Sequence, residues 1–213
     1  AQHNDRVSLL EAMLLVVIFV MPIWPRYAII YINGLPNINL TRILVFILIY
    51  YWIISLLGPN KEYIKNITTK LKANKGLAYC LVLFFVLKYF SALASSEFMY
   101  SFNIVTDEFV NYFLLFLIGL TIWQTPQQVS RALLVIVASS LVVTLFGLYE
   151  AYLNHNILSD IIPVPTEFVE QALAAKYRQG YRIQSTFSNP LALAEYLVFI
   201  IPLAIVLFLK KRN

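Results

Sequence analysis

The sequence predicts an all-α integral membrane protein, a bundle of about six transmembrane helices with a short extracytoplasmic amphipathic helix. Of the 213 residues, 60% are hydrophobic and 13% are charged, whereas soluble domains carry roughly 25% charged residues. The apolar residues gather in runs that approach the ~20 residues a membrane-spanning helix needs. Because the charges that would solvate a globular surface are missing, the expected solvent is the lipid bilayer.

Six apolar runs follow one another, and they end at proline, glycine, aromatic or charged residues that suit a membrane boundary. They cover residues 9–24, 43–57, 77–94, 109–123, 132–152 and 191–209. We expect each run to form a transmembrane helix. Residues 1–213 are expected to form a single transmembrane domain, since the connections leave no room for a large soluble domain.

The connections between the runs differ in charge, and this difference predicts their sides of the membrane. Residues 58–76 carry five lysines and one acid, whereas the connection after residue 94 carries Glu97, Asp107 and Glu108 and no basic residue. Cytoplasmic loops are enriched in lysine and arginine. If both termini are cytoplasmic, the inside holds Arg6, Lys61, Lys65, Lys70, Lys72, Lys75, Arg131, Lys210, Lys211 and Arg212, and the outside holds Arg26, Arg42, Lys176, Arg178 and Arg182. This asymmetry explains the net charge of +5 without nucleic-acid binding.

Residues 153–189 are the longest polar segment and are predicted to be an extracytoplasmic loop. Thr166 is suited to cap the start of a helix, and Gly180 is suited to end it. Apolar residues recur at helical spacing between them, which predicts a short amphipathic helix on the membrane surface. Lys176 and Arg178 fall in its last turn, where the helix dipole favours cations. Phosphate contact is the alternative role for these two residues.

Three further charged residues are candidates for a site. Arg182 lies beyond Gly180, so the dipole does not account for it, and its planar guanidinium suits phosphate oxygens. We predict phosphate or sugar contact for Arg182, with interface anchoring as the alternative. Lys88 and Glu195 lie inside predicted spans, where charges usually face a partner or a cavity. For Lys88, pairing with an acid is the alternative to lining a polar pocket.

Other catalytic chemistry is sparse in the sequence. The chain has one cysteine and two histidines, His3 and His155. No histidine, cysteine and carboxylate cluster has metal-ligand spacing, and no glycine-rich phosphate loop occurs. The sequence therefore predicts neither a metal nor a cofactor. No internal repeat is visible, which disfavours a transporter built from inverted halves.

Residues 182–202, RIQSTFSNPLALAEYLVFIIP, resemble the signature of the O-antigen ligase and polymerase family of bacterial envelope enzymes. In outline, that signature is an arginine, then Thr-Phe-x-Asn-Pro, an alanine and a hydrophobic helix that closes on a proline. The matching residues are Arg182, Ser185, Thr186, Phe187, Ser188, Asn189, Pro190, Ala194, Tyr196, Leu197 and Pro202. The chain departs from the signature at Ser185, where glycine is common, and at Leu191, where a second asparagine is common.

The resemblance implies a multi-pass glycosyltransferase of the bacterial inner membrane, without metal or nucleotide sugar. Such a protein would transfer glycans from undecaprenyl diphosphate to an acceptor glycan or lipid in lipopolysaccharide or exopolysaccharide biosynthesis. Arg182 would be the catalytic residue that contacts the diphosphate. The candidate substrate-binding residues are Lys176, Arg178, Asn189, Glu195 and Lys88.

Proteins of this family are longer than this chain, which implies that it is the N-terminal half of such an enzyme and inactive alone. The alternative function is that of a non-catalytic membrane protein. It would be a transporter, a flippase-like bundle or a scaffold for polysaccharide assembly.

Overall fold

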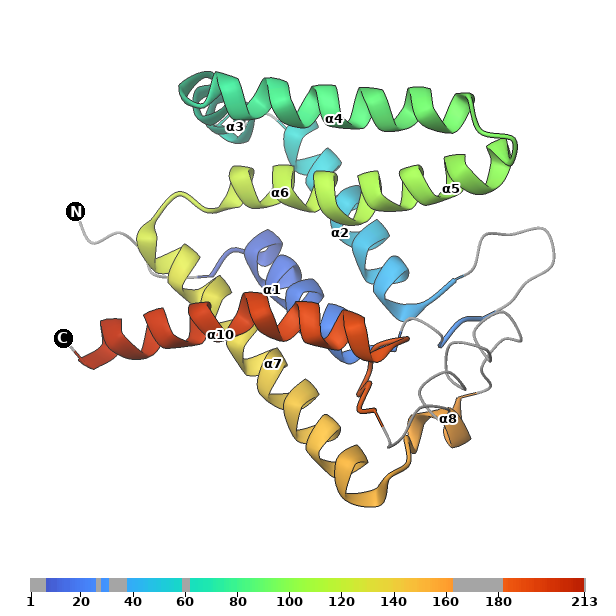
Figure 1. Cartoon of the computed structure of the whole chain (residues 1–213). Coiled ribbons are helices and arrows are strands. Elements are labelled where there is room, and N and C mark those ends of the chain that lie inside the picture. Colours follow the sequence, from blue (N-terminus) through green and yellow to red (C-terminus); the bar gives the residue numbers. More distant parts are fainter. Residues whose placement is uncertain (1–6, 26–27, 31–37, 59–61, 163–181, 213) are drawn as a thin grey trace. The chain divides into compact units, whose positions relative to one another are not determined.

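The structure is a computed structural model that describes residues 7–25, 28–30, 38–58, 62–162 and 182–212. In these ranges the regular structure is helical, apart from one isolated antiparallel bridge between Ile30 and Ile38 (Figure 1). The predicted all-α class is therefore confirmed. The amphipathic helix expected at residues 166–180 lies outside the described residues.

The helices, in chain order, are α1 (Leu9–Ile23), α2 (Leu40–Leu57), α3 (Glu62–Ala73), α4 (Lys75–Leu93), α5 (Phe98–Glu108), the π-helical segment η1 (Phe109–Leu114), α6 (Leu115–Ile122), α7 (Pro126–Leu153), α8 (Leu158–Ile161) and α10 (Pro190–Arg212). Five stretches of the described chain are long and apolar enough to cross a bilayer: Leu40–Leu57, Lys75–Leu93, Phe98–Ile122, Pro126–Leu153 and Pro190–Leu209. They indicate a membrane protein.

The first predicted span corresponds to the shorter helix α1. It is apolar but has only 15 residues. At 1.5 Å per residue it is about 22 Å long, which is less than the ~30 Å hydrocarbon core. The span expected at residues 9–24, and with it the number of six spans, therefore stays a prediction.

The fourth span begins earlier than the sequence pattern predicts. Residues 109–123 were expected to form the helix after an acidic loop, but the helix begins at Phe98 and continues through η1 and α6. Asp107 and Glu108 consequently lie inside a helix. One physical reason is that the Asn111 side chain donates to both the carbonyl and the carboxylate of Asp107, each at 2.9 Å, at the start of the π-helical turn. A second reason is that Glu108 has a partner on α4, described below.

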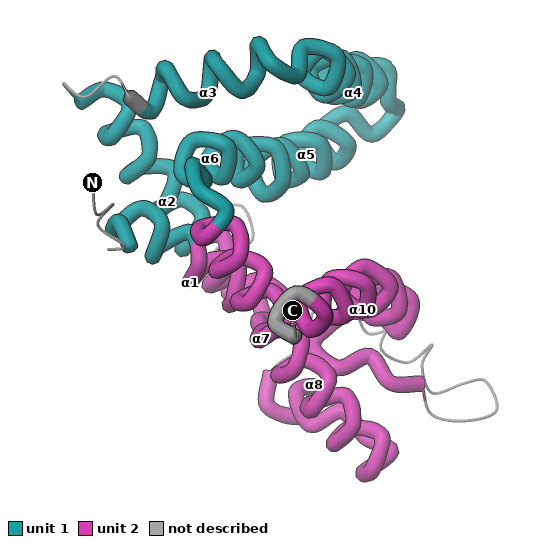
Figure 2. Tube along the Cα trace, turned by 90° about the vertical axis from the view of Figure 1, so that its left-hand side faces the viewer, with its two compact units in different colours: residues 1–14, 44–126 teal, residues 15–43, 127–213 magenta. Residues whose placement is uncertain are grey.

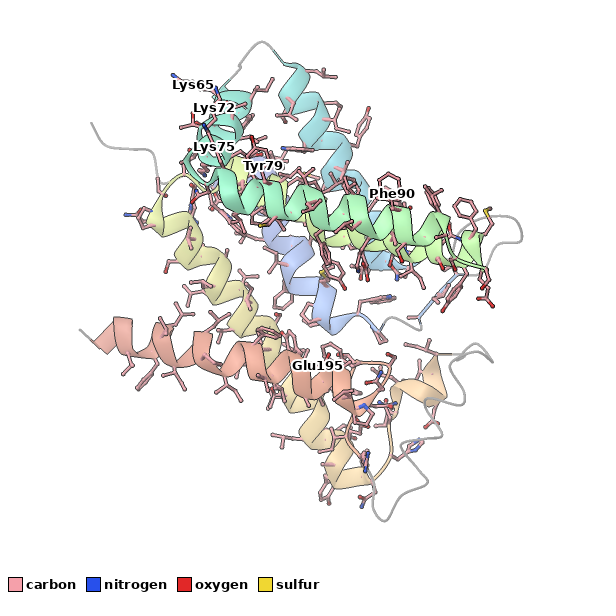
Figure 3. The ribbon with its side chains drawn as sticks, turned by 45° about the horizontal axis from the view of Figure 1, so that its top comes forward. Lys65, Lys72, Lys75, Tyr79, Phe90 and Glu195 are labelled. Carbon is pink, nitrogen blue, oxygen red and sulfur yellow. The ribbon has the colours of Figure 1, made fainter. Side chains whose placement is uncertain are left out.

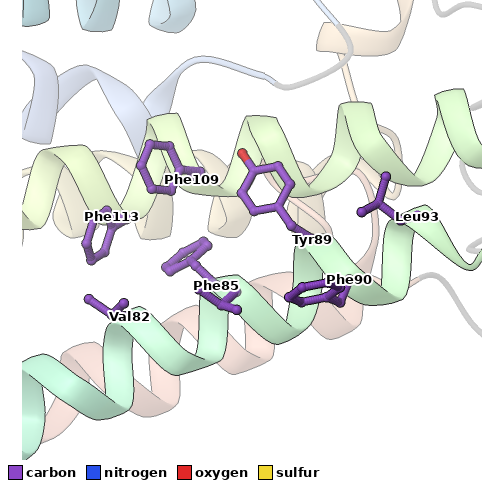
Figure 4. A pocket seen from close by; sticks show the side chains of 8 residues that line it. Val82, Phe85, Tyr89, Phe90, Leu93, Phe109 and Phe113 are labelled. Carbon is purple, nitrogen blue, oxygen red and sulfur yellow. The ribbon is translucent and has the colours of Figure 1, made fainter.

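The chain divides into two compact units, residues 1–14 with 44–126 and residues 15–43 with 127–213 (Figure 2). In the first unit, α4 packs along α5, and α3 packs against α6 and α4. The contact between α4 and η1 is aromatic. Phe85 lies 5.4 Å from Phe109 and 5.0 Å from Phe113 between ring centroids. These rings border an apolar cavity of about 360 Å³, lined by Val82, Phe85, Val86, Tyr89, Phe90, Leu93, Phe109 and Phe113 (Figure 4).

The basic connection at residues 58–76 also folds into a helix, α3, and one of its lysines stabilises a neighbour. The Lys70 ammonium donates to the carbonyl of Leu120 at 2.7 Å and to the carbonyl of Trp123. These carbonyls belong to the end of α6, where backbone acceptors have no helical partner and the dipole favours a cation. Burial lowers the pKa of Lys70. Lys70 therefore fixes α3 against the end of α6.

Candidate functional site

The signature stretch forms a polar loop, residues 182–189, that leads directly into α10. Asn189 Oδ1 accepts a hydrogen bond from the Ala192 backbone N–H at 2.8 Å, and Pro190 is the first residue of the helix. Asparagine at the cap and proline at the first helical position are both favoured helix-start residues. Asn189, predicted to bind substrate, therefore caps α10 through its side-chain oxygen.

A buried carboxylate holds the middle of this loop. Glu150, in the last turn of α7, is 1% exposed. Its carboxylate oxygens accept the backbone N–H groups of Gln184 at 3.2 Å and Ser185 at 2.5 Å. Glu150 thus acts as the main anchor of the loop.

Ser185 is the most constrained residue of the loop. Its φ of 54° lies in the left-handed region, which non-glycine residues seldom adopt. Its hydroxyl donates to the carbonyl of Val143 at 2.7 Å, and its own carbonyl accepts from the side-chain amide of Asn156 at 2.8 Å. These bonds to α7 and to the segment after it compensate for the unfavourable backbone conformation.

Two further contacts complete the attachment of the loop. The Thr186 hydroxyl donates to the carbonyl of Pro22 in the same unit at 2.7 Å. On α7, a Cβ built on Gly147 would lie 3.2 Å from Ile183 Cγ2, so glycine permits the close approach of the loop. The loop is therefore fixed by hydrogen bonds from several directions and by close packing on α7.

The predicted site residues fall in different environments. Arg182 opens the loop with an exposed side chain, and Glu195 is exposed on α10 (Figure 3). Lys176 and Arg178 lie outside the described residues. Lys88 belongs to the other unit and forms an ion pair with Glu108, with its ammonium 5.0 Å from the Phe84 ring centroid. Arg182 is thus part of the anchored loop. Lys88 is paired with an acid, which is the alternative that the sequence left open.

Sequence reasoning did not assign Glu150, Asn156 or Gln184 to the site. Glu150 and Asn156 are buried and bond the loop backbone. Gln184 is 5% exposed, and its side-chain oxygen has no hydrogen-bond partner in the described structure. A buried acceptor of this kind can receive a hydroxyl or amide hydrogen. In the sequence, the only feature that could have pointed to these three residues is that they are polar and lie at or beyond the end of an apolar run.

Comparisons with protein-family models, curated proteins and solved structures give no match for the chain. Within the described ranges, no group of three or more histidine, cysteine or acidic side chains could hold a metal ion. The loop instead offers an exposed guanidinium and a buried amide oxygen on a rigid backbone. Such groups can bind an anionic, hydroxyl-rich molecule.

Proposed function

We propose that this chain belongs to a bacterial inner-membrane glycan ligase or polymerase. It would act on glycans carried on undecaprenyl diphosphate, in O-antigen or exopolysaccharide assembly. In this proposal both termini are cytoplasmic, six helices span the membrane, and residues 153–189 face the extracytoplasmic side. The acceptor is a second glycan or a lipid.

One observation carries this proposal: the Glu150 carboxylate fixes the backbone of the loop that presents Arg182. A cation that binds a diphosphate headgroup must be positioned before the ligand arrives, because ordering a flexible loop would cost binding free energy. The resemblance to the family signature adds support at Ser185. Glycine is common at that position in the family, and the φ of 54° is one that glycine adopts readily.

The proposed reaction is a displacement at the anomeric carbon of the lipid-linked sugar. The acceptor oxygen forms a bond to that carbon, and the bond from the carbon to the diphosphate oxygen breaks. The electron pair of the broken bond leaves with undecaprenyl diphosphate, while the acceptor hydroxyl loses its proton to a base. Arg182 would stabilise the charge that develops on the leaving diphosphate.

Arg182→Ala is expected to weaken binding of undecaprenyl diphosphate roughly tenfold or more, because charge-assisted hydrogen bonds contribute about 1.5–3 kcal/mol. Binding is measured on the purified chain by native mass spectrometry, with undecaprenol as the ligand that lacks the diphosphate. Arg182→Lys should retain part of the affinity. The matched control is Arg131→Gln, near the start of α7 and far along the helix from Glu150. This variant should bind undecaprenyl diphosphate as the wild type does.

Equal affinity of the wild type and Arg182→Ala for the diphosphate lipid would contradict the proposal. Equal affinity for undecaprenol and undecaprenyl diphosphate would do the same. Either result would favour the non-catalytic alternative, a polysaccharide transporter, a flippase-like bundle or an assembly scaffold.

A further inference from the structure

Three exposed lysines of the first unit lie on and beside α3. Lys65 and Lys72 are seven residues apart, which places them two turns apart on one face of the helix. Lys75 begins α4, one residue after Asn74, which itself follows α3. All three side chains are exposed, and Figure 3 shows them gathered at the start of α4. We call Lys65, Lys72 and Lys75 the lysine stripe.

The packing of α3 keeps the lysine stripe on its outer side. Ile67, Lys70 and Leu71 are half-buried, and α3 packs against α6 and α4. Lys70 is additionally bonded to the carbonyls of Leu120 and Trp123 at the end of α6. Because the opposite face of α3 packs against α6 and α4, the lysine stripe stays exposed.

The direction of α3 places the stripe at the level of lipid headgroups. In Figure 1 α4 is seen from the side and α3 along its axis, whereas in Figure 2 α3 is seen from the side and α4 along its axis. The two helices therefore run in clearly different directions. α4 is long and apolar enough to span the membrane from Lys75 onward, and with α4 across the bilayer, α3 would run along the membrane surface.

Residues next to the stripe have the character of a membrane boundary. Tyr79, one turn into α4, is 73% exposed, and Leu77 is 57% exposed. Tyrosine is enriched at the level of the headgroups. Apolar side chains beside it suit the outermost part of the hydrocarbon region. A lipid can therefore place its phosphate on the lysines while its acyl chains lie along α4.

We propose that the lysine stripe is a binding site for anionic phospholipids, with Lys65, Lys72 and Lys75 contacting their phosphate groups. Clusters of lysine next to a membrane span attract anionic headgroups. A bilayer surface supplies many phosphates in one plane, which matches three lysines distributed along a helix that lies in that plane. The site is independent of the proposed glycan transfer, because it requires only that α4 crosses the bilayer.

The test uses the full chain reconstituted into phosphatidylcholine vesicles that contain a small fraction of spin-labelled phosphatidylglycerol or spin-labelled phosphatidylcholine. Electron paramagnetic resonance measures the fraction of each labelled lipid that the protein immobilises. The wild type should prefer phosphatidylglycerol, and the preference should fall about fivefold per lysine removed at low salt. The variant with Lys65→Gln, Lys72→Gln and Lys75→Gln should show no preference.

A matched variant with Lys65→Arg, Lys72→Arg and Lys75→Arg keeps the charge and should retain the preference. Circular dichroism checks that both variants keep their helix content. Equal immobilisation of the two lipids by the wild type would overturn the proposal, as would a full preference in the glutamine variant. Loss of the preference in inorganic phosphate, but not in chloride of equal ionic strength, would show that the lysines take soluble phosphate instead.

Discussion

Glu150→Ala is expected to lower the free energy of unfolding by about 2–4 kcal/mol. The substitution leaves the buried backbone N–H groups of Gln184 and Ser185 without their acceptor. It also removes one of the hydrogen bonds that hold Ser185, whose backbone is left-handed. The loss is measured by thermal or denaturant unfolding of the purified chain in detergent micelles.

The controls for Glu150 lie on the same helix. Glu150→Gln keeps one side-chain oxygen as an acceptor and should lose roughly half as much stability. Tyr149→Ala, at the exposed neighbouring position, should change the free energy of unfolding by much less. Hydrogen exchange should accelerate at the Gln184 and Ser185 amides in Glu150→Ala. Unchanged stability together with slow exchange at these amides would contradict the anchoring role of Glu150.

Lys88→Met is expected to destabilise the first unit by about 2–3 kcal/mol, because it leaves Glu108 as an unpaired charge inside the candidate span Phe98–Ile122. Both helices that carry the pair are candidate membrane spans. At the surface of a soluble protein, water would solvate the Glu108 carboxylate after the Lys88 ammonium is removed, whereas lipid acyl chains cannot. The free energy of unfolding is measured in detergent micelles and compared with that of the wild type.

A double-mutant cycle separates the pair from its surroundings. Combining Lys88→Met with Glu108→Leu removes both charges, and the double variant should be more stable than either single variant. Glu97→Gln, an exposed acid just before α5, is the control and should have little effect. Additive losses in the double variant would show that Lys88 and Glu108 do not depend on one another.

Sequence patterns predicted the features that depend on local residue order. The apolar runs predicted the long helices, and the run at residues 191–209 corresponds to α10, which begins one residue earlier at Pro190. The position of Glu108 could not be predicted in this way. An acid is expected outside a span unless its partner is known, and here the partner lies 20 residues earlier on a neighbouring helix.

The anchor of the loop was also beyond sequence reasoning. Glu150 bonds backbone groups 34 and 35 residues away. Every residue except proline has a backbone N–H, so the sequence does not mark which ones a carboxylate will bind. A single carboxylate near the end of an apolar run is typical of a residue at the membrane boundary. Ser185 gave a weak signal, since the family signature commonly has glycine at this left-handed position.

Labelling of a cysteine placed in the loop tests the central claim most directly, namely that this loop presents Arg182 to a lipid diphosphate outside the membrane. The variant combines Ser188→Cys with Cys80→Ser, which removes the native cysteine. Right-side-out bacterial membrane vesicles are treated with a membrane-impermeant maleimide. We predict labelling from outside, with protection by undecaprenyl diphosphate and not by undecaprenol. Labelling only after the vesicles are opened, or equal protection by both lipids, would contradict the claim.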